Sequence, residues 1–289
     1  AYETLAWLRD GDPHKRLTVR GRRCLEKLAP LLLAEVLDSA NPDQALSNLE
    51  TFIRGIRART TYFSLLVENP GIVKLLVALF SSSQLLSRIF IQRPELLDTL
   101  VARSYAVENK DRDQLAASLA EQMALAEDYE LQLDGLRRFR NEEFLRIALN
   151  DLHGQMKQGQ GAMQLSWVAE VCLEQAVEMA HKELAVRFGA PYADEAQGDA
   201  EETAFAIVGM GKLGGWELNY HSDLDIIFIY DSEGQTRPTV GTDSGRFRQL
   251  SNHEYFAKLA QRIITALTLV TREGMVYEID TRLRPSGNQ

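Results

Sequence analysis

The stretch Gly209-Met210-Gly211-Lys212-Leu213-Gly214-Gly215, followed by Ser222-Asp223-Leu224-Asp225, lies between two short apolar runs at residues 205–208 and 226–230. Both runs are rich in β-branched and aromatic residues, which predicts two buried strands with the glycines in the turn between them. A glycine-rich turn leaves backbone N–H groups open to a ligand. This turn and the acidic residues after it are the strongest indication of a ligand site in the chain.

Two known ligand-binding loops do not fit this segment. A Walker A loop would need glycine at position 206 and serine or threonine at position 213, but the chain has Ala206 and Leu213. A calcium-binding EF-hand loop that starts at Asp223 places its next ligand on Ile227 and its required glycine on Phe228. The residues therefore exclude a Walker A loop and argue against calcium.

The glycines also satisfy the dinucleotide-binding pattern GxGxxG. Gly209, Gly211 and Gly214 have the required spacing, and Asp231 follows about 20 residues on, at the end of the next predicted strand. That fold needs a crossover of a dozen or so residues between parallel strands, and only residues 216–221 are available here. We therefore interpret the match as coincidental.

Three aspartates provide a better explanation. Asp223 and Asp225 are two positions apart at the start of a strand, so their side chains point to the same face. Asp280 is expected to follow Val276 and Glu278 on one face of a later strand. Converging carboxylates repel one another unless cations lie between them, and hard oxygen ligands suit Mg²⁺. Such a site can hold two metal ions about 4 Å apart, as in enzymes that displace pyrophosphate from a nucleoside triphosphate.

A second set of residues is expected to contact phosphate. Its members are Gly209, Gly211, Lys212, Gly214, Gly215, Ser222 and Arg282. The glycines admit backbone N–H groups, and Lys212 supplies a point charge. Arg282 could clamp a phosphate or neutralise the carboxylates, and we favour the phosphate. His221 is interpreted as a hydrogen-bonding neighbour rather than a metal ligand, whereas Glu217 and Glu278 could be outer partners of the site or members of structural ion pairs.

Helical periodicity dominates the chain up to about residue 188. Asn41-Pro42-Asp43 supplies a cap residue and a first-turn proline for one helix. Further amphipathic helices are expected at residues 72–80, 94–102, 113–126, 136–152 and 165–188. The basic cluster at residues 137–140 is interpreted as a solvated helix face rather than a docking patch, and Trp7, Trp167 and Trp216 as packing residues.

The expected fold class is α+β. An all-helical domain is predicted at residues 1–189, an acidic linker at 190–203, and an α/β domain, incomplete at its end, at 204–289. In this second domain the order is strand, glycine turn, strand, helix and strand. The capping box Ser251-Asn252-His253-Glu254 opens the helix, and the last strand is expected at residues 275–282.

Composition limits the classes of partner. The 289 residues carry a formal net charge of -9, which argues against nucleic acid as a partner. The longest charge-free apolar stretch has about 13 residues, whereas a membrane span needs about 20, so no membrane association is expected.

Cys24 and Cys172 indicate no disulfide framework, and the cytoplasm is the expected compartment. The first residue is not methionine and no closing element ends the sequence, so we expect a fragment of a longer protein.

Several motifs resemble one family of enzymes. They are Gly-Met-Gly-Lys-Leu-Gly-Gly-Trp-Glu-Leu-Asn at 209–219, Ser-Asp-Leu-Asp at 222–225, Tyr-Glu-Ile-Asp-Thr-Arg-Leu-Arg-Pro-Ser-Gly at 277–287, and the helical segments 59–66 and 93–98. Together they resemble the bacterial glutamine synthetase adenylyltransferases, which are bifunctional members of the DNA polymerase β-like nucleotidyltransferases. The resemblance covers nearly the whole chain.

The resemblance implies Mg²⁺-dependent transfer of AMP from ATP to a tyrosine of glutamine synthetase, and so regulation of nitrogen assimilation. It makes Asp223, Asp225 and Asp280 the metal ligands, with Asp280 helping to activate the tyrosine oxygen. Many polymerase-like relatives have Gly-Ser where this chain has Gly211-Lys212, so either a hydroxyl or the ammonium could meet the phosphate. The family also responds to the PII nitrogen-signalling protein, with glutamine and 2-oxoglutarate as signals.

Two alternatives to AMP transfer stay open. Enzymes of this family have an amino-terminal half that removes AMP by phosphorolysis and a carboxyl-terminal half that adds it. The helical lead-in and the Arg-Pro-Ser-Gly ending resemble the adding half, whereas Met210 and Asn219 are more similar to the removing half. The third possibility is a nucleotide-binding regulatory module without catalysis, because the chain stops soon after Asp280.

Overall fold

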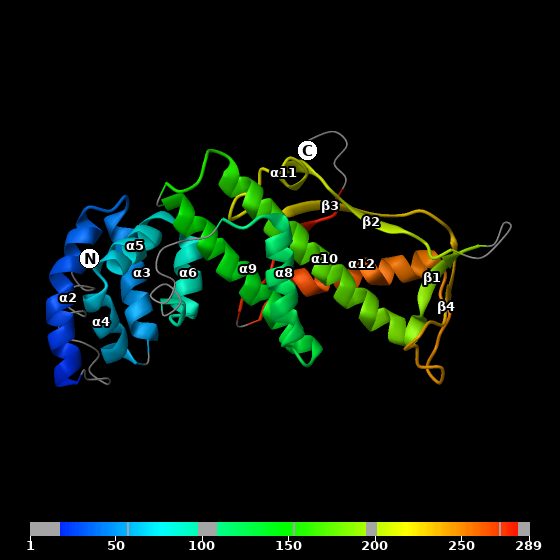
Figure 1. Ribbon diagram of the computed structural model, residues 1–289, viewed down its shortest axis with the longest axis horizontal. Helices are drawn as coiled ribbons and strands as arrows, with labels where there is room; N and C mark the ends of the chain where they lie inside the picture. Colours follow the sequence, from blue (N-terminus) through cyan, green and yellow to red (C-terminus); the bar gives the residue numbers. More distant parts are fainter. Residues whose placement is uncertain are drawn as a thin grey trace. The chain divides into compact units, whose positions relative to one another are not determined.

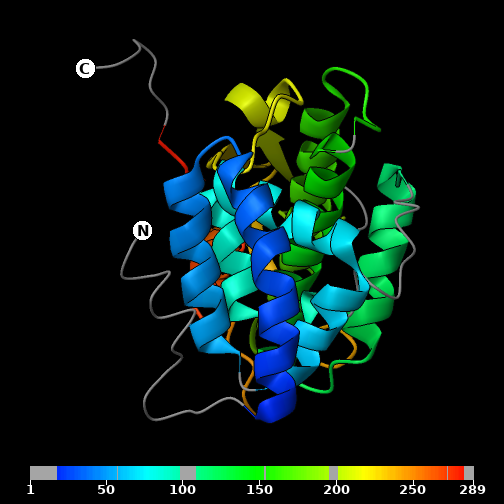
Figure 2. The ribbon, with the colours of Figure 1, turned by 90° about the vertical axis from the view of Figure 1, so that its left-hand side faces the viewer.

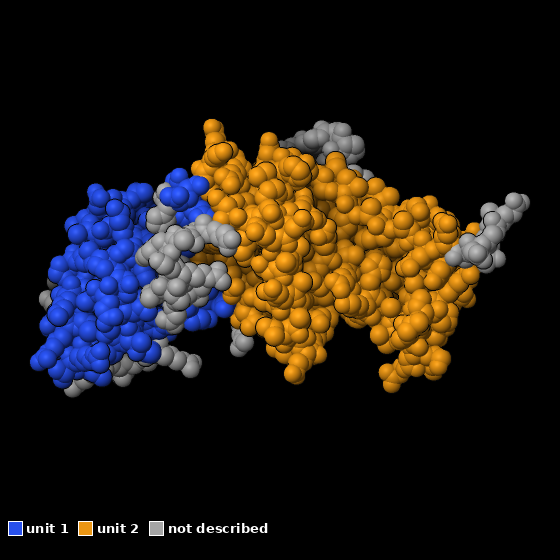
Figure 3. All heavy atoms as spheres, viewed as in Figure 1, with its two compact units in different colours: residues 1–108, 148–155 blue, residues 109–147, 156–289 orange. Residues whose placement is uncertain are grey.

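The computed structural model describes residues 18–56, 58–97, 109–152, 154–194, 201–271 and 273–282. The chain divides into two units, Ala1–Glu108 with Ala148–Gln155, and Asn109–Ile147 with Met156–Gln289 (Figure 3). The candidate site residues all belong to the second unit. The predicted helix at 94–102, Trp7 and the Arg-Pro-Ser-Gly ending fall wholly or mostly outside the described residues.

The described part of the first unit is helical. Its helices are α2 (Val19–Leu37), α3 (Pro42–Gly55), α4 (Arg59–Glu68), α5 (Pro70–Ser82) and α6 (Gln84–Gln92). Figure 2 shows these helices side by side, with α2 against α4 and α5, and α3 against α5 and α6. The Asn41 side chain caps α3 by accepting from the Gln44 N–H, as the sequence predicts. The rings of Phe52 and Phe80 meet edge to face in the core, with centroids 5.6 Å apart.

No single helix among the described residues is both long enough and apolar enough to cross a bilayer. Among the described helices, only α4 and α5 taken together reach that length and composition, and the chain bends by 109° between them. Most of α5 is buried within the first unit.

The second unit contains α8 (Arg112–Ala124), most of α9 (Tyr129–Leu152), α10 (Gln160–Phe188), the short α11 (Gly211–Gly214) and α12 (Asn252–Thr268). Helix α10 packs against α8 and α12 (Figure 1). The predicted capping box is confirmed, because Ser251 accepts from the Glu254 N–H while the Glu254 side chain accepts from the Ser251 N–H. Together with the strands described next, these helices make the fold a mixture of helix and sheet.

The main sheet has the strand order β2-β3-β5, formed by Phe205–Gly209, Leu224–Tyr230 and Ile279–Asp280. Strand β2 pairs antiparallel with β3, and β3 pairs parallel with β5. The antiparallel pair confirms that no dinucleotide-type crossover follows the glycines. A second antiparallel pair joins β1 (Ala190–Ala193) to β4 (Gly234–Arg237).

Aromatic side chains fill the space between one face of the main sheet and α12. Phe205 of β2 stacks on Phe228 of β3 and on Phe256 of α12, with centroids 6.0 and 5.4 Å apart. The other face is open, which differs from the expectation that both strands are buried. Val208 and Ile229 are 38% and 49% exposed, because an antiparallel sheet needs cover on one face only.

Two segments differ from their predicted structure. Strand β1 lies inside the predicted linker, where its main chain pairs with β4 despite the lack of an apolar pattern. The last strand is much shorter than residues 275–282, because the N–H groups of Val276 and Tyr277 donate to Leu267 O at the end of α12. Val276 therefore lies before the strand and is buried, while Glu278 is exposed, so the expectation that Val276 shares a strand face with Glu278 and Asp280 was wrong for Val276.

The expected solvated face at residues 137–140 was also wrong. Arg137 is fully buried and Arg140 is 9% exposed. Both belong to the second unit, with α8 and α10. The second unit thus begins at Asn109, well before the domain boundary predicted at residue 189. That domain boundary stays a prediction.

Candidate metal and nucleotide site

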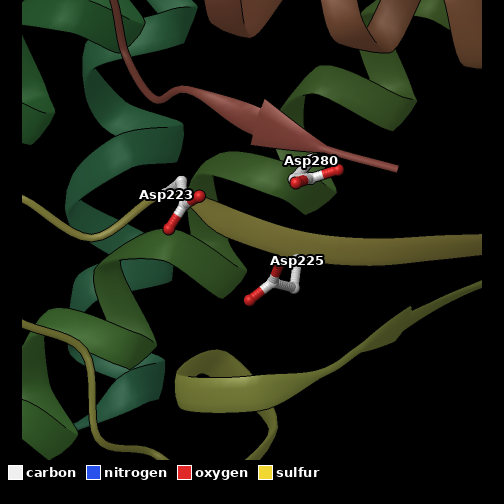
Figure 4. Close-up of side chains that lie close together, drawn as sticks. All are labelled: Asp223, Asp225 and Asp280. Carbon is white, nitrogen blue, oxygen red and sulfur yellow. The ribbon is translucent and has the colours of Figure 1, made fainter. Parts of the chain in front are cut away.

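The three predicted aspartates meet at one end of the main sheet (Figure 4). Asp225 is the second residue of β3 and pairs in register with Asp280 of β5, while Asp223 directly precedes β3. One carboxylate oxygen from each residue lies within 4.8 Å of the other two. Asp223 is exposed and the other two are half-buried. The parallel pairing of β3 with β5 thus brings together residues that are far apart in the sequence.

The chemistry of this cluster fits a divalent cation. Mg²⁺ binds oxygen at about 2.1 Å, so ligands on opposite sides of one ion lie about 4.2 Å apart. The oxygen atoms of Asp223, Asp225 and Asp280 lie within 4.8 Å of one another, which is close to that spacing. Within the described ranges, these three form the one group of acidic, histidine or cysteine side chains close enough to hold a metal ion, and His221 is not part of it.

Arg282 lies beside the cluster and pairs with Asp280 through two hydrogen bonds. Its Nε donates to Oδ1 at 2.9 Å and its Nη2 to Oδ2 at 2.7 Å, and the backbone N–H of Arg282 also donates to Oδ1. Asp280, and to a smaller extent Asp223, raises the pKa of Arg282. Of the two roles considered for Arg282, this geometry supports neutralisation of the carboxylates.

The glycine turn lies against Asp225. Gly211 has a φ of +51°, and a Cβ at this position would lie 2.7 Å from Asp225 Oδ2. At Gly214 a Cβ would lie 2.6 Å from Gly209 O. The N–H of Met210 donates to Asp225 O at 2.8 Å, which fixes the turn to β3. Glycine is therefore required at 214 by close approach to the backbone, and at 211 by the positive φ, whereas the Asp225 carboxylate could move away from a side chain at 211.

Of the other predicted phosphate contacts, Lys212 and Gly215 lie at this turn, and Ser222 lies in the loop before Asp223. Lys212 and Gly215 are exposed. Ser222 Oγ donates to Asn219 Oδ1 and accepts from the Asn219 N–H, so it closes the loop that leads to Asp223. His221 is exposed, and its backbone N–H donates to Asn219 Oδ1. Asn219 was not among the predicted site residues, yet its side chain organises this loop.

Trp216 was expected to be a packing residue, but its side chain is 51% exposed. Its backbone has a φ of +56°, and its indole N–H donates to Glu170 Oε1 at 2.8 Å. Trp216 borders a pocket of about 530 Å³ between α8, α10 and the strand face of Phe205 and Ile207. The alternation along β2 and β3 puts this face opposite to the one that carries Asp225.

Carboxylates that converge in this way are typical of enzymes that hold divalent cations to act on phosphate groups. The comparisons with known proteins agree. Residues 73–289 match the family model described as glutamate-ammonia ligase adenylyltransferase. The bifunctional glutamine synthetase adenylyltransferase/adenylyl-removing enzyme of Thioalkalivibrio sulfidiphilus is 39% identical over 289 residues, which are 99% of this chain and 29% of that relative. The chain belongs to the glutamate-ammonia ligase adenylyltransferase family and spans less than a third of this relative's length.

Proposed function

We propose that the second unit carries a Mg²⁺-dependent site that transfers AMP from ATP to a tyrosine of glutamine synthetase. The observation that carries this proposal is the convergence of Asp223, Asp225 and Asp280 within 4.8 Å, in a chain of the adenylyltransferase family. Mg²⁺ held by these carboxylates would neutralise the triphosphate and stabilise the pyrophosphate that leaves. By family resemblance, PII is a further partner and the cytoplasm the compartment.

In this reaction the tyrosine hydroxyl oxygen forms a bond to the α-phosphorus of ATP, the bond from that phosphorus to the bridging oxygen breaks, and pyrophosphate leaves. Asp280 is proposed to orient the hydroxyl and favour loss of its proton. Gly211 allows the turn to approach Asp225 closely, so its backbone can lie beside the phosphates. Lys212 is exposed and can extend toward them.

The reverse modification is the second candidate. The relative's name includes an adenylyl-removing activity, and a site of this type can also bind inorganic phosphate beside an adenylylated tyrosine. Phosphate would then attack the AMP phosphorus, and ADP would be released with the free tyrosine. The two candidates differ in their products, because transfer yields pyrophosphate and removal yields ADP.

The test is to incubate the protein with glutamine synthetase, radiolabelled ATP and Mg²⁺, and separately with adenylylated glutamine synthetase and phosphate. We expect Asp223→Asn and Asp225→Asn to lower AMP transfer by more than about a hundredfold, because each removes a metal ligand. Both variants should stay folded, since one charge fewer relieves repulsion among the carboxylates.

The matched control is Asp194→Asn, which changes an exposed carboxylate of the same unit. Its transfer rate should equal that of the wild type. Undiminished transfer by Asp223→Asn would refute the site assignment. ADP release without AMP transfer would favour removal, and metal-dependent ATP binding without either product would favour a regulatory module.

A further inference from the structure

One face of α9 binds the segment between α12 and β5. Asp134, Arg137 and Asn141 lie on this face, because three or four residues make one helical turn. Arg137 donates to Leu269 O at 2.5 Å and to Gly274 O at 2.9 Å. In addition, Thr271 donates to Asp134 Oδ1 and Asn141 to Glu273 O. These bonds fix the chain just before the strand that carries Asp280.

Phe144 lies three residues beyond Asn141, on the same face of α9, and is 1% exposed. Its ring meets Tyr220 edge to face, with centroids 5.5 Å apart, and Tyr277 in the same way at 6.1 Å. The Arg140 guanidinium lies 4.1 Å from the centroid of the Phe144 ring and 5.5 Å from that of Tyr277. One buried ring therefore contacts two separate segments of the chain.

These two segments carry the acid cluster. Tyr220 precedes Asp223 by three residues, and Tyr277 precedes Asp280 by three residues. Next to the aspartates the segments are joined by main-chain bonds, since the Leu224 N–H donates to Glu278 O and β3 pairs with β5. At their far ends both tyrosine rings contact Phe144. The distance between the carboxylates thus depends on contacts at both ends of each segment.

We propose that Phe144 is a positioning residue, which holds the Tyr220 and Tyr277 segments so that Asp223 and Asp280 can bind one divalent cation together. This inference rests on the proposed function, because it assumes that the acid cluster binds Mg²⁺. Phe144 itself touches neither metal nor substrate. Removing its ring leaves all three ligands present but less well held, and residues that orient metal ligands typically change affinity by about 10- to 100-fold.

The test is direct titration of the protein with Mn²⁺ alone, following the free ion by electron paramagnetic resonance. Phe144→Leu should weaken Mn²⁺ binding about tenfold or more. In transfer assays it should lower kcat at saturating ATP more than it changes the KM for ATP. Phe139→Leu is the matched control, because Phe139 is 2% exposed on the same helix and makes no ring contact with either tyrosine. Its Mn²⁺ affinity should stay within about twofold of the wild type.

A second pair of variants tests the contact from the loop side and remains informative if Phe144→Leu does not fold. Tyr220→Leu removes the partner ring and should weaken Mn²⁺ binding, whereas Tyr220→Phe keeps the ring and should restore it. Wild-type Mn²⁺ affinity in Tyr220→Leu, or equal losses in Phe144→Leu and Phe139→Leu, would overturn the inference alone. Mn²⁺ binding that Asp223→Asn leaves unchanged would overturn the proposed function and this inference with it.

Discussion

Substitution of Gly211 by alanine separates the chemistry of the site from the stability of the fold. The added Cβ would lie 2.7 Å from Asp225 Oδ2, whereas ordinary contact begins at 3.4 Å. The carboxylate must therefore move by about 0.7 Å or rotate away. Because it is the end of a flexible side chain, this movement costs little folding energy. The main cost to stability is the φ of +51°, which an L-residue adopts at about 1 to 2 kcal/mol.

The effect on metal binding should be larger than the effect on stability. Metal–ligand distances in real sites lie within about 0.2 Å of their standard values, so a shift of about 0.7 Å in the Asp225 carboxylate should weaken its binding to the ion. We expect Mn²⁺ affinity to fall about tenfold or more, and AMP transfer about a hundredfold, since misplacement by about 1 Å costs that much in rate.

The assay combines thermal unfolding, Mn²⁺ titration and transfer of labelled AMP. The matched control is Gly154→Ala in the first unit, because Gly154 has a similar φ of +65° and a Cβ added there would meet no atom within 4 Å. Both variants should lose a similar 1 to 2 kcal/mol, roughly, from their folding free energy. Only Gly211→Ala should lose metal affinity and transfer. Wild-type transfer by Gly211→Ala would refute the reasoning.

Two further predictions concern charge. Arg282→Gln removes the cation that pairs with Asp280, so Mn²⁺ affinity without nucleotide should rise, by up to about fivefold for an exposed pair; weaker binding would contradict this competition. Burial lowers the pKa of His181, and the negative charge of Glu202 offsets part of this lowering. The His181 side chain therefore binds a proton more readily in the unfolded chain than in the folded protein. The stability from this group is present above the unfolded pKa of about 6.5 and is lost as the pH falls through the folded pKa. The drop in Tm from about pH 7.5 to 5.5 should be smaller in His181→Gln than in the wild type, with the exposed His253→Gln as control. Equal drops in all three would show that His181 does not contribute.

The sequence alone determined the features that depend on neighbouring residues. The cap at Asn41 and the capping box at Ser251 were predictable, because each satisfies backbone N–H groups within one turn of the same helix. The short spacer at 216–221 was enough to exclude a dinucleotide fold, and β2 and β3 are indeed antiparallel. Local spacing also placed Asp223 and Asp225 at the start of a strand.

Tertiary structure decided what depends on partners distant in the sequence. Arginine usually lies at the surface, but Arg137 is buried. The carbonyl groups of Leu269, at the end of α12, and of Gly274 accept its hydrogen bonds. The meeting of Asp225 with Asp280 depends on the register of a two-residue strand, which residues 275–282 alone did not reveal. Main-chain pairing and buried hydrogen bonds are satisfied by whichever segment folding brings near, and no local pattern specifies that segment.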